Sequence, residues 1–154
     1  MARGIDRVRS FVDNTGIEAK IFEFDRTTKT SQHAAEALGC EVAQIAKSIV
    51  FTDDSLLVVV ISGDRRVDPT KLSTLVRDDV SMADPETVKR LTGYSIGGVP
   101  PFPHQCNVKV FIDLSVDRYR AVWVAAGAPN AVMKVRVDAL KSIIGAEFVD
   151  VAKD

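Results

Sequence analysis

The spacing of apolar residues along the chain predicts a mixture of helices and strands. Between residues 5 and 14 they recur at helical spacing, which predicts a helix that ends near Gly16. Ser48 to Thr52 and Leu56 to Ser62 are apolar and β-branched and flank a polar turn at 53–55, a pattern typical of a β-hairpin. Further strands are expected at 19–24, 108–112, 121–126, 131–137 and 147–151.

Short helices are expected between these strands. Asp68-Pro69 and Asp84-Pro85 each place a capping carboxylate before a proline, so helices are predicted to start there and to run to Val76 and Leu91. Further helices are expected at 31–38, capped by Ser31 and ended by Gly39, at 138–144, and as a single turn within 41–46.

The alternation of helices and strands predicts an α/β fold. Several connections are too short for the crossovers that parallel strands require, so we expect a curved sheet that is mixed or mostly antiparallel. The chain has 154 residues, the length of one ordinary domain, and shows no internal repeat and no linker. We therefore treat residues 1–154 as a single domain.

The charge balance excludes a protein that holds nucleic acid by bulk electrostatic attraction. The chain contains 20 Lys and Arg residues and 21 Asp and Glu residues, so its net charge is −1. The longest apolar run, Leu56 to Ile61, is too short for a membrane helix, and the N-terminus lacks the apolar stretch of a signal peptide. These features predict a cytoplasmic protein that makes no membrane contact.

The cysteines and histidines favour neither a metal nor a cofactor. The two cysteines, Cys40 and Cys106, and the two histidines, His33 and His104, have no ligand spacing, so no metal site is expected. A Cys–His nucleophile pair stays open as an alternative. Cys40 follows an expected helix C-terminus, where the dipole raises a thiol pKa, so a buried packing role is the simpler interpretation.

Lys47 is the first candidate for chemistry. Strand alternation places it on one face with Ile49 and Phe51, while Ser48 shares the other face with Val50. A partly buried ammonium costs several kcal/mol unless an anion offsets it. Two interpretations follow: a lysine that snorkels at the start of a strand, or a cation that awaits the phosphate or carboxyl group of a substrate.

The second candidate is the loop from Gly93 to His104, which is rich in glycine and proline. Its three prolines remove backbone donors, so it is a poor phosphate cradle, but Gly97 and Gly98 allow a ligand to approach the backbone closely. A rigid surface turn is the alternative. The small residues at 125–130 allow either close approach of a ligand or a plain hairpin loop. Trp123 is expected in the core.

The order of these features resembles the YbaK/prolyl-tRNA-synthetase-associated domain family. The matching stretches are Ala34-Ala-Glu-Ala-Leu-Gly-Cys40, Gln44-Ile-Ala-Lys-Ser-Ile-Val-Phe51, Ser62-Gly-Asp64, Gly97-Gly-Val-Pro-Pro101 and Ala126-Gly127. The resemblance implies a barrel-like mixed sheet flanked by helices, in a free-standing protein. It also implies trans-editing, the hydrolysis of the ester that joins a wrong amino acid to the 3′-terminal adenosine of a tRNA.

The resemblance also implies a set of site residues. The lysine characteristic of the family corresponds to Lys47, and the backbone of Gly98 would orient the aminoacyl carbonyl or a water, so both are expected to be catalytic. The expected substrate-binding residues are Ser48, Gly97, Val99, Pro100, His104, Ala126, Gly127 and Asn130.

An aminoacyl ester is already activated, so attack by a positioned water, or assistance by the substrate itself, is expected to suffice. The expected substrate is a mis-acylated proline tRNA or a similar tRNA, bound weakly through its 3′ end, and an aminoacyl-tRNA synthetase is a further expected partner. The alternatives are a non-catalytic module that binds aminoacyl-tRNA ends or a synthetase, and a hydrolase of another small aminoacyl ester. The sequence leaves the amino acid and the oligomeric state open.

Overall fold

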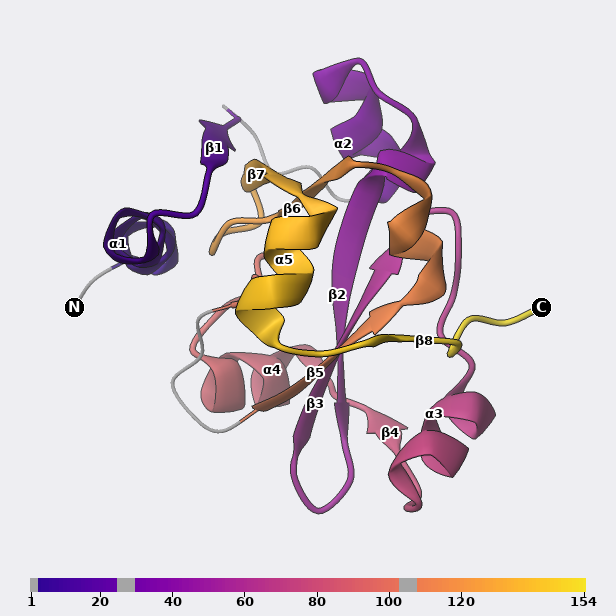
Figure 1. Cartoon of the computed structure of the whole chain (residues 1–154). Helices are drawn as coiled ribbons and strands as arrows, with labels where there is room; N and C mark the ends of the chain where they lie inside the picture. Colours follow the sequence, from indigo (N-terminus) through magenta and orange to yellow (C-terminus); the bar gives the residue numbers. More distant parts are fainter. Residues whose placement is uncertain (1–2, 25–29, 103–107) are drawn as a thin grey trace.

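A curved mixed sheet forms the centre of the protein in a computed structural model that describes residues 3–24, 30–102 and 108–154 (Figure 1). The strands are β1 (Ala19–Glu23), β2 (Ile45–Thr52), β3 (Leu56–Ser62), β4 (Ser81–Met82), β5 (Val108–Asp113), β6 (Ala121–Ala125), β7 (Ala131–Arg136) and β8 (Phe148–Val149). Their order across the sheet is β1-β7-β6-β2-β3-β5-β8, and β4 pairs with β2. The predicted mixed α/β fold is confirmed, and the sheet curves without closing.

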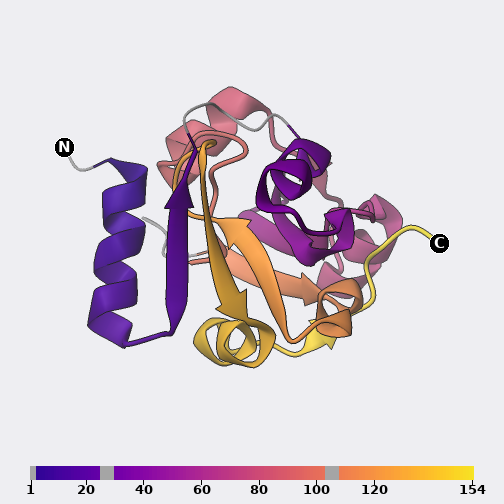
Figure 2. The ribbon, with the colours of Figure 1, turned by 90° about the horizontal axis from the view of Figure 1, so that it is seen from above.

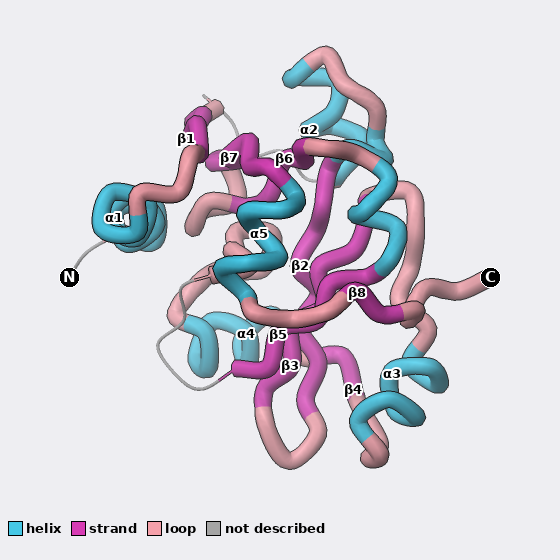
Figure 3. The backbone as a smooth tube through the Cα atoms, viewed as in Figure 1, coloured by secondary structure: helices cyan, strands magenta, loops and turns pink. Residues whose placement is uncertain are grey.

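The helices lie around this sheet (Figure 3). They are α1 (Gly4–Thr15), α2 (Ser31–Leu38), α3 (Pro69–Val76), α4 (Pro85–Thr92) and α5 (Val137–Ile144), with 3-10 turns η1 (Val42–Gln44) and η2 (Leu114–Arg118). Asp68 accepts hydrogen bonds from the backbone N–H groups of Thr70 and Lys71 in α3, and Asp84 accepts one from the backbone N–H of Thr87 in α4. Both predicted helix starts are therefore confirmed, with the proline at the first helical position.

Strand β3 is buried on both of its faces, which explains its unbroken apolar sequence. Val58 and Val60 point into a large core that also contains residues of α1, α4 and α5. Leu57 and Val59 point into a second core under α3. Successive side chains of a strand alternate between the faces of the sheet, so an apolar residue is needed at every position.

The N-terminal helix lies beside the edge of the sheet, where α1 and β1 run next to each other (Figure 2). Ile5 and Val8 of α1 are buried in the large core, and Ala19 and Ile21 of β1 pack against it. This arrangement covers one face of β1 and leaves its other face, which carries Lys20 and Phe22, exposed.

Two sequence predictions need correction, and one short strand is absent from them. Thr30, not Ser31, caps α2, because the Thr30 side chain accepts a hydrogen bond from the backbone N–H of His33. The last strand is only Phe148–Val149, because its pairing with β5 stops at Asp113. Strand β4 was not expected, since two residues carry no periodicity and its formation depends on the edge of β2.

Candidate functional site

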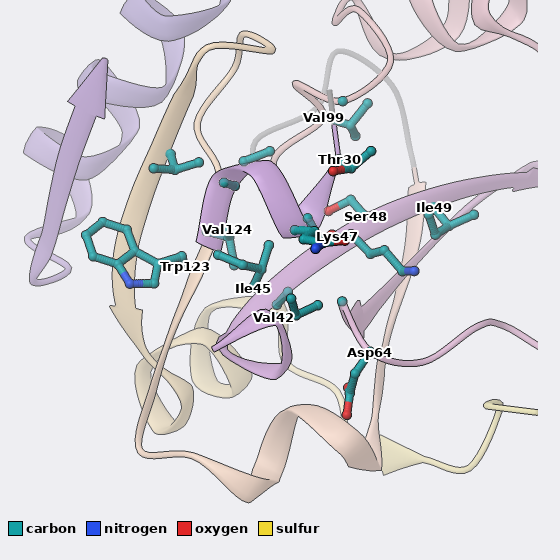
Figure 4. Close-up of a pocket in the computed structure, with 18 of the residues that line it drawn as sticks. Thr30, Val42, Ile45, Lys47, Ser48, Ile49, Asp64, Val99, Trp123 and Val124 are labelled. Atoms are coloured by element: carbon teal, nitrogen blue, oxygen red, sulfur yellow. The ribbon is translucent and has the colours of Figure 1, made fainter. Parts of the chain in front are cut away.

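A pocket of about 650 Å³ opens beside the first half of β2. Its wall is built from β2, β6, β7, the start of α2, the turn that follows β3 and the loop that follows α4. These segments are distant in sequence, so the pocket forms only when β2, β6 and β7 have come together in the sheet. Figure 4 shows the labelled side chains that line it.

The pocket lies where two neighbouring strands, β2 and β6, separate from each other. Strand β2 pairs with β6 at Ile45 and Ala46 only, and at its other end it pairs with β4 at Phe51 and Thr52. Between these two pairs, the edge of β2 has no neighbouring strand in the described part of the chain. Polar backbone groups at such an edge need another partner.

Ser48 lies in the middle of this unpaired edge. The carbonyl of Ile45 accepts from the N–H of Gly63, next to β3, whereas the carbonyl of Val50 accepts from the N–H of Ala83, on the opposite side of β2. Backbone groups alternate between the two edges of a strand, so the N–H and C=O of Ser48 share the edge of Val50 and face the gap. The Ser48 hydroxyl is also buried, and within the described residues it has no hydrogen-bond partner.

The side chain of Lys47 projects from the face of β2 opposite to that of the Ser48 side chain. It lies there between two apolar clusters. Ile45 belongs to the small cluster under α2, and Phe51 belongs to the core under α3. Lys47 is half-buried between them and lines the pocket (Figure 4). In the part of the chain that the structure describes, its ammonium forms no hydrogen bond and no ion pair.

Burial is the main reason that the pKa of Lys47 lies below its ordinary value of 10.5. The positive charge of Arg66, another pocket residue, lowers the pKa further, and Asp64 opposes the shift. Lys47 and Arg66 thus repel each other in one pocket, an arrangement that favours an anionic ligand because the ligand would relieve their repulsion.

The carboxylate of Asp64 is already engaged by other residues. Arg118 donates two hydrogen bonds to it, at 2.7 and 3.1 Å, and Arg65 lies 3.7 Å away. The hydrogen bonds from Arg118 are the main cause of the lowered pKa of Asp64. Figure 4 shows the Asp64 side chain pointing away from Lys47. The pocket therefore keeps its positive charge even though a carboxylate lies at its rim.

The glycine loop contributes to the pocket through some of its predicted residues. Gly97, with φ of +84°, and Val99 line the pocket. Gly98 does not, because its N–H donates to the carbonyl of Ser95 and its own carbonyl accepts from the N–H of Gly127. A Cβ at Gly98 would lie 2.7 to 2.9 Å from the backbone of Ala128, so a close approach of two loops requires this glycine. The catalytic role of Gly98 stays a prediction.

Several other predicted substrate-binding residues lie behind the pocket wall. Ala126 and Pro100 are buried, and Gly127 packs against the backbone of Gly4 at the start of α1. Asn130 donates a side-chain hydrogen bond of 3.0 Å to the carbonyl of Phe24. None of these four residues lines the pocket, and their substrate contacts stay predictions. His104 lies outside the described residues.

The structure adds residues that the sequence did not single out. Arg65 and Arg66 line the pocket directly after β3, and Trp123 lines it from β6. Trp123 was expected in the core, but it is only partly buried because β6 turns away from β2 beside it. The signal that could have identified Arg65 and Arg66 in the sequence is their position as a pair of arginines shortly after a buried strand.

The described residues contain no group of three or more His, Cys, Asp or Glu residues that could hold a metal ion. Among their helices, none is both long enough and apolar enough to cross a membrane.

Comparisons with known proteins point to one family. The sequence profile of the aminoacyl-tRNA editing domain matches residues 25–143. The uncharacterized protein YwhH of Bacillus subtilis is 30% identical over 150 residues, which cover 96% of each chain. The proline–tRNA ligase of Lactobacillus acidophilus is 35% identical over 100 residues, which make up 64% of this chain and 18% of the ligase.

Solved structures show the same similarity. The crystal structure of a candidate trans-editing enzyme for prolyl tRNA synthetase has a TM-score of 0.93 and 33% sequence identity, and the match covers 100% of this chain and 99% of that one. The crystal structure of a Marinobacter aquaeolei protein, with a TM-score of 0.68 and 14% identity, shares the fold. The first match spans every segment that builds the pocket.

Proposed function

The chain belongs to the aminoacyl-tRNA editing domain family, and from this we propose that it is a trans-editing deacylase, which hydrolyses the ester between a wrongly attached amino acid and its tRNA. The observation that carries the proposal is the half-buried Lys47, a cation with no fixed partner in the described structure, in a pocket that also contains Arg66. A cation kept in such a place is suited to an anion or to a developing negative charge.

Lys47 has two roles in this reaction. It attracts the phosphate of the 3′-terminal nucleotide, and it stabilises the negative charge that develops on the ester as the carbonyl carbon is attacked. Both roles need an ammonium that no carboxylate neutralises, and Arg118 keeps Asp64 away from it. The low polarity of the neighbouring Ile45 and Ile49 strengthens the interaction.

Ser48 provides the hydrogen bonds that position the aminoacyl group. Its backbone N–H and C=O lie along the unpaired edge of β2, and its buried hydroxyl has no hydrogen-bond partner among the described residues. The C=O can accept from the α-ammonium group of the substrate, and the N–H or hydroxyl can donate to the ester. Groups that are held in place before the substrate arrives need little reorganisation during the reaction.

The reaction itself is a simple hydrolysis. The oxygen of a water attacks the ester carbonyl carbon, the bond to the ribose oxygen breaks, and that oxygen takes up a proton from the water. The products are the free amino acid and an intact tRNA with both terminal hydroxyl groups. The substrate's own amine or neighbouring ribose hydroxyl assists the proton transfer, so no side-chain nucleophile is required.

The identity of the relatives guides the choice of tRNA. Proline–tRNA ligases contain a segment similar to this chain, so we take the substrate to be a proline tRNA that carries an amino acid other than proline. This activity belongs in the cytoplasm, where tRNAs are charged, and a prolyl-tRNA synthetase is the partner that would deliver the substrate.

The test is single-turnover hydrolysis of a panel of tRNAs, with mischarged proline tRNAs first. The protein is expected to release the amino acid from at least one of them well above the spontaneous rate. Lys47→Ala is expected to slow this release about 100-fold or more, the typical loss for one preorganised electrostatic contact.

Lys109→Ala is the matched control, because Lys109 is an exposed lysine on β5 outside the pocket wall. Its activity is expected to equal that of the parent. If the folded parent protein releases no amino acid from any tRNA of the panel, the deacylase proposal is wrong. Binding without hydrolysis would then favour the non-catalytic module.

A further inference from the structure

The face of the sheet that carries the pocket continues beyond it onto β7 and β1. Trp123 of β6 lies opposite Lys134 of β7, and Lys134 lies opposite Lys20 of β1, so the three form one row. In the next row, Val132 of β7 lies opposite Phe22 of β1. Directly paired residues project to the same face of a sheet, so Lys20, Phe22 and Lys134 share the face of Trp123.

These residues form a compact group, which we call the aromatic–lysine patch: Lys20, Phe22, Trp123 and Lys134. The rings of Phe22 and Trp123 meet edge to face, with their centroids 5.4 Å apart. The ammonium of Lys20 lies 5.2 Å from the centroid of Phe22, and that of Lys134 lies 6.0 Å from the centroid of Trp123. Phe22 is 38% exposed, a large value for an aromatic ring beside a sheet.

The patch is positively charged in its own right. Glu23, its acidic neighbour on β1, points to the other face, where Arg3 and Arg9 lie 3.7 and 3.6 Å from its carboxylate. Neither Lys20 nor Lys134 forms an ion pair with any residue that the structure describes. The two exposed lysines are therefore available to an anionic partner.

The patch also shares a residue with the pocket. Trp123 lines the pocket, and so does Val132, which is the direct cross-strand partner of Phe22. A ligand that fills the pocket and extends along the sheet towards β1 would pass directly over the two rings. The pocket and the patch together thus offer one continuous surface that is cationic and aromatic.

We propose that the aromatic–lysine patch binds the unpaired bases that precede the terminal nucleotide of the tRNA, while the aminoacyl end occupies the pocket. This inference rests on the proposed function. Bases of single-stranded RNA stack on aromatic rings, and flanking lysines contact the phosphates. Because the chain has a net charge of −1, a local patch of this kind supplies the attraction that the whole protein lacks.

The first test is a binding measurement that needs no catalysis. The chain contains one tryptophan, so its fluorescence reports on Trp123 alone. The RNA trinucleotide CCA is expected to quench this fluorescence in a saturable way. Phe22→Ala is expected to weaken its binding about tenfold, in the range for one stacked base. Lys134→Ala is expected to lower the salt dependence of binding by about one phosphate contact.

The matched controls are Leu114→Ala and Lys109→Ala, an exposed apolar residue and an exposed lysine outside the patch and the pocket. Both are expected to bind the trinucleotide as the parent does. Absence of quenching in the parent overturns the proposal. Equal weakening by the control variants overturns it too, because the effect would then not belong to the patch.

The second test separates the patch from the deacylase activity itself. Hydrolysis is compared for full-length mischarged tRNA and for 3′-O-aminoacyl adenosine, which lacks the preceding nucleotides. Phe22→Ala is expected to raise KM for the tRNA about tenfold, and this increase should be at least fivefold larger than the change with aminoacyl adenosine. Equal increases in KM for both substrates would mean that Phe22 only maintains the structure of the pocket. That result would overturn the proposal that the patch binds the preceding bases.

The two proposals fail in different ways. If the parent hydrolyses aminoacyl adenosine and tRNA with the same KM, the deacylase stands and the patch is wrong. If the parent hydrolyses neither substrate, the deacylase proposal is wrong, and the fluorescence titration with CCA decides the patch alone.

Discussion

Arg118 holds Asp64 by two hydrogen bonds, at 2.7 and 3.1 Å, and this pairing keeps the Asp64 carboxylate from Lys47, which has no carboxylate partner among the described residues. Both side chains of the pair are about one-third exposed, so solvent screens their attraction only in part. The pair therefore acts on the pocket indirectly, by controlling which cation the acidic group at its rim can reach.

Removal of Arg118 is expected to reduce deacylation. In Arg118→Ala, the Asp64 carboxylate is free to turn towards Lys47 and to compete with the substrate. We expect kcat/KM to fall about fivefold, since an exposed ion pair is worth up to about 1 kcal/mol. Steady-state kinetics on a mischarged tRNA measures the effect.

The double variant Asp64→Ala/Arg118→Ala tests the cause of this loss. It is expected to regain most of the activity, because the competing carboxylate is gone. Arg136→Ala serves as the control, since it breaks the exposed pair with Asp138 away from the pocket. A double variant as slow as Arg118→Ala would show that Arg118 acts in some other way.

Lys47→Arg is expected to restore only part of the activity lost in Lys47→Ala. The guanidinium is planar and broader than an ammonium, and Arg66 already lines the same pocket. We expect a rate at least tenfold below that of the parent, measured by single-turnover hydrolysis. A fully active Lys47→Arg would mean that the pocket needs only a positive charge and no compact ammonium.

The lowered pKa of Lys47 predicts how stability depends on pH. Burial favours the neutral amine in the folded protein, so the charged form costs stability at neutral pH, and the cost is relieved as pH rises through the lowered pKa towards the ordinary 10.5. Lys47→Met is therefore expected to be as stable as the parent or more stable at pH 7. Its advantage should shrink at alkaline pH.

Urea denaturation at a series of pH values measures this difference. Deacylation by the parent should fall over the same alkaline range, because the neutral amine no longer attracts the substrate phosphate. A Lys47→Met variant that is less stable than the parent at pH 7 would favour a structural role for the lysine.

Two neighbouring glycines are expected to respond differently to alanine. In Gly98→Ala, the new methyl group would lie within 2.9 Å of the Ala128 backbone, so we expect a loss of about 1–3 kcal/mol in the free energy of unfolding. In Gly97→Ala, the nearest atom is 4.0 Å away, but φ of +84° costs about 1 kcal/mol. Chemical denaturation of both variants should rank Gly98→Ala as the less stable, and the reverse order would contradict this account.

Deacylation is expected to need neither a metal nor a thiol. Burial raises the pKa of the Cys40 thiol, so at neutral pH it is protonated and a poor nucleophile. The Cys40→Ser/Cys106→Ser double variant should keep the activity of the parent, and so should the parent in excess EDTA. Loss of turnover in a double variant that still folds would revive a cysteine nucleophile.

The sequence predicted best the elements whose signals are local. The hairpin of β2 and β3 follows from two apolar runs around a polar turn, and the starts of α3 and α4 follow from their Asp-Pro pairs. Strand β4 was missed because Ser81 and Met82 are defined only by the edge of β2 that they meet. The half-buried place of Lys47 could be predicted because a charge within an apolar alternation is itself a local signal, whereas its catalytic role stays a prediction.

The rest of the pocket depends on contacts between distant segments. Gly127 and Gly98 permit close approach within the protein, and a sequence alone does not distinguish such a glycine from one that faces a ligand. Trp123 lines the pocket where β2 and β6 separate after Ala46, and Arg66 reaches it from the turn that follows β3. Periodicity describes which face of a strand a residue occupies, but it carries no information on where two strands part.

The pairing of β1 with β7 has a consequence for protein synthesis. Strand β1 ends at Glu23, and its partner begins at Ala131, so most of the chain must leave the ribosome before the two can meet. The pocket wall also needs β6 and β7, which are made late. A chain that has been translated only as far as β5 therefore lacks the site, which can form only after β6 and β7 have left the ribosome.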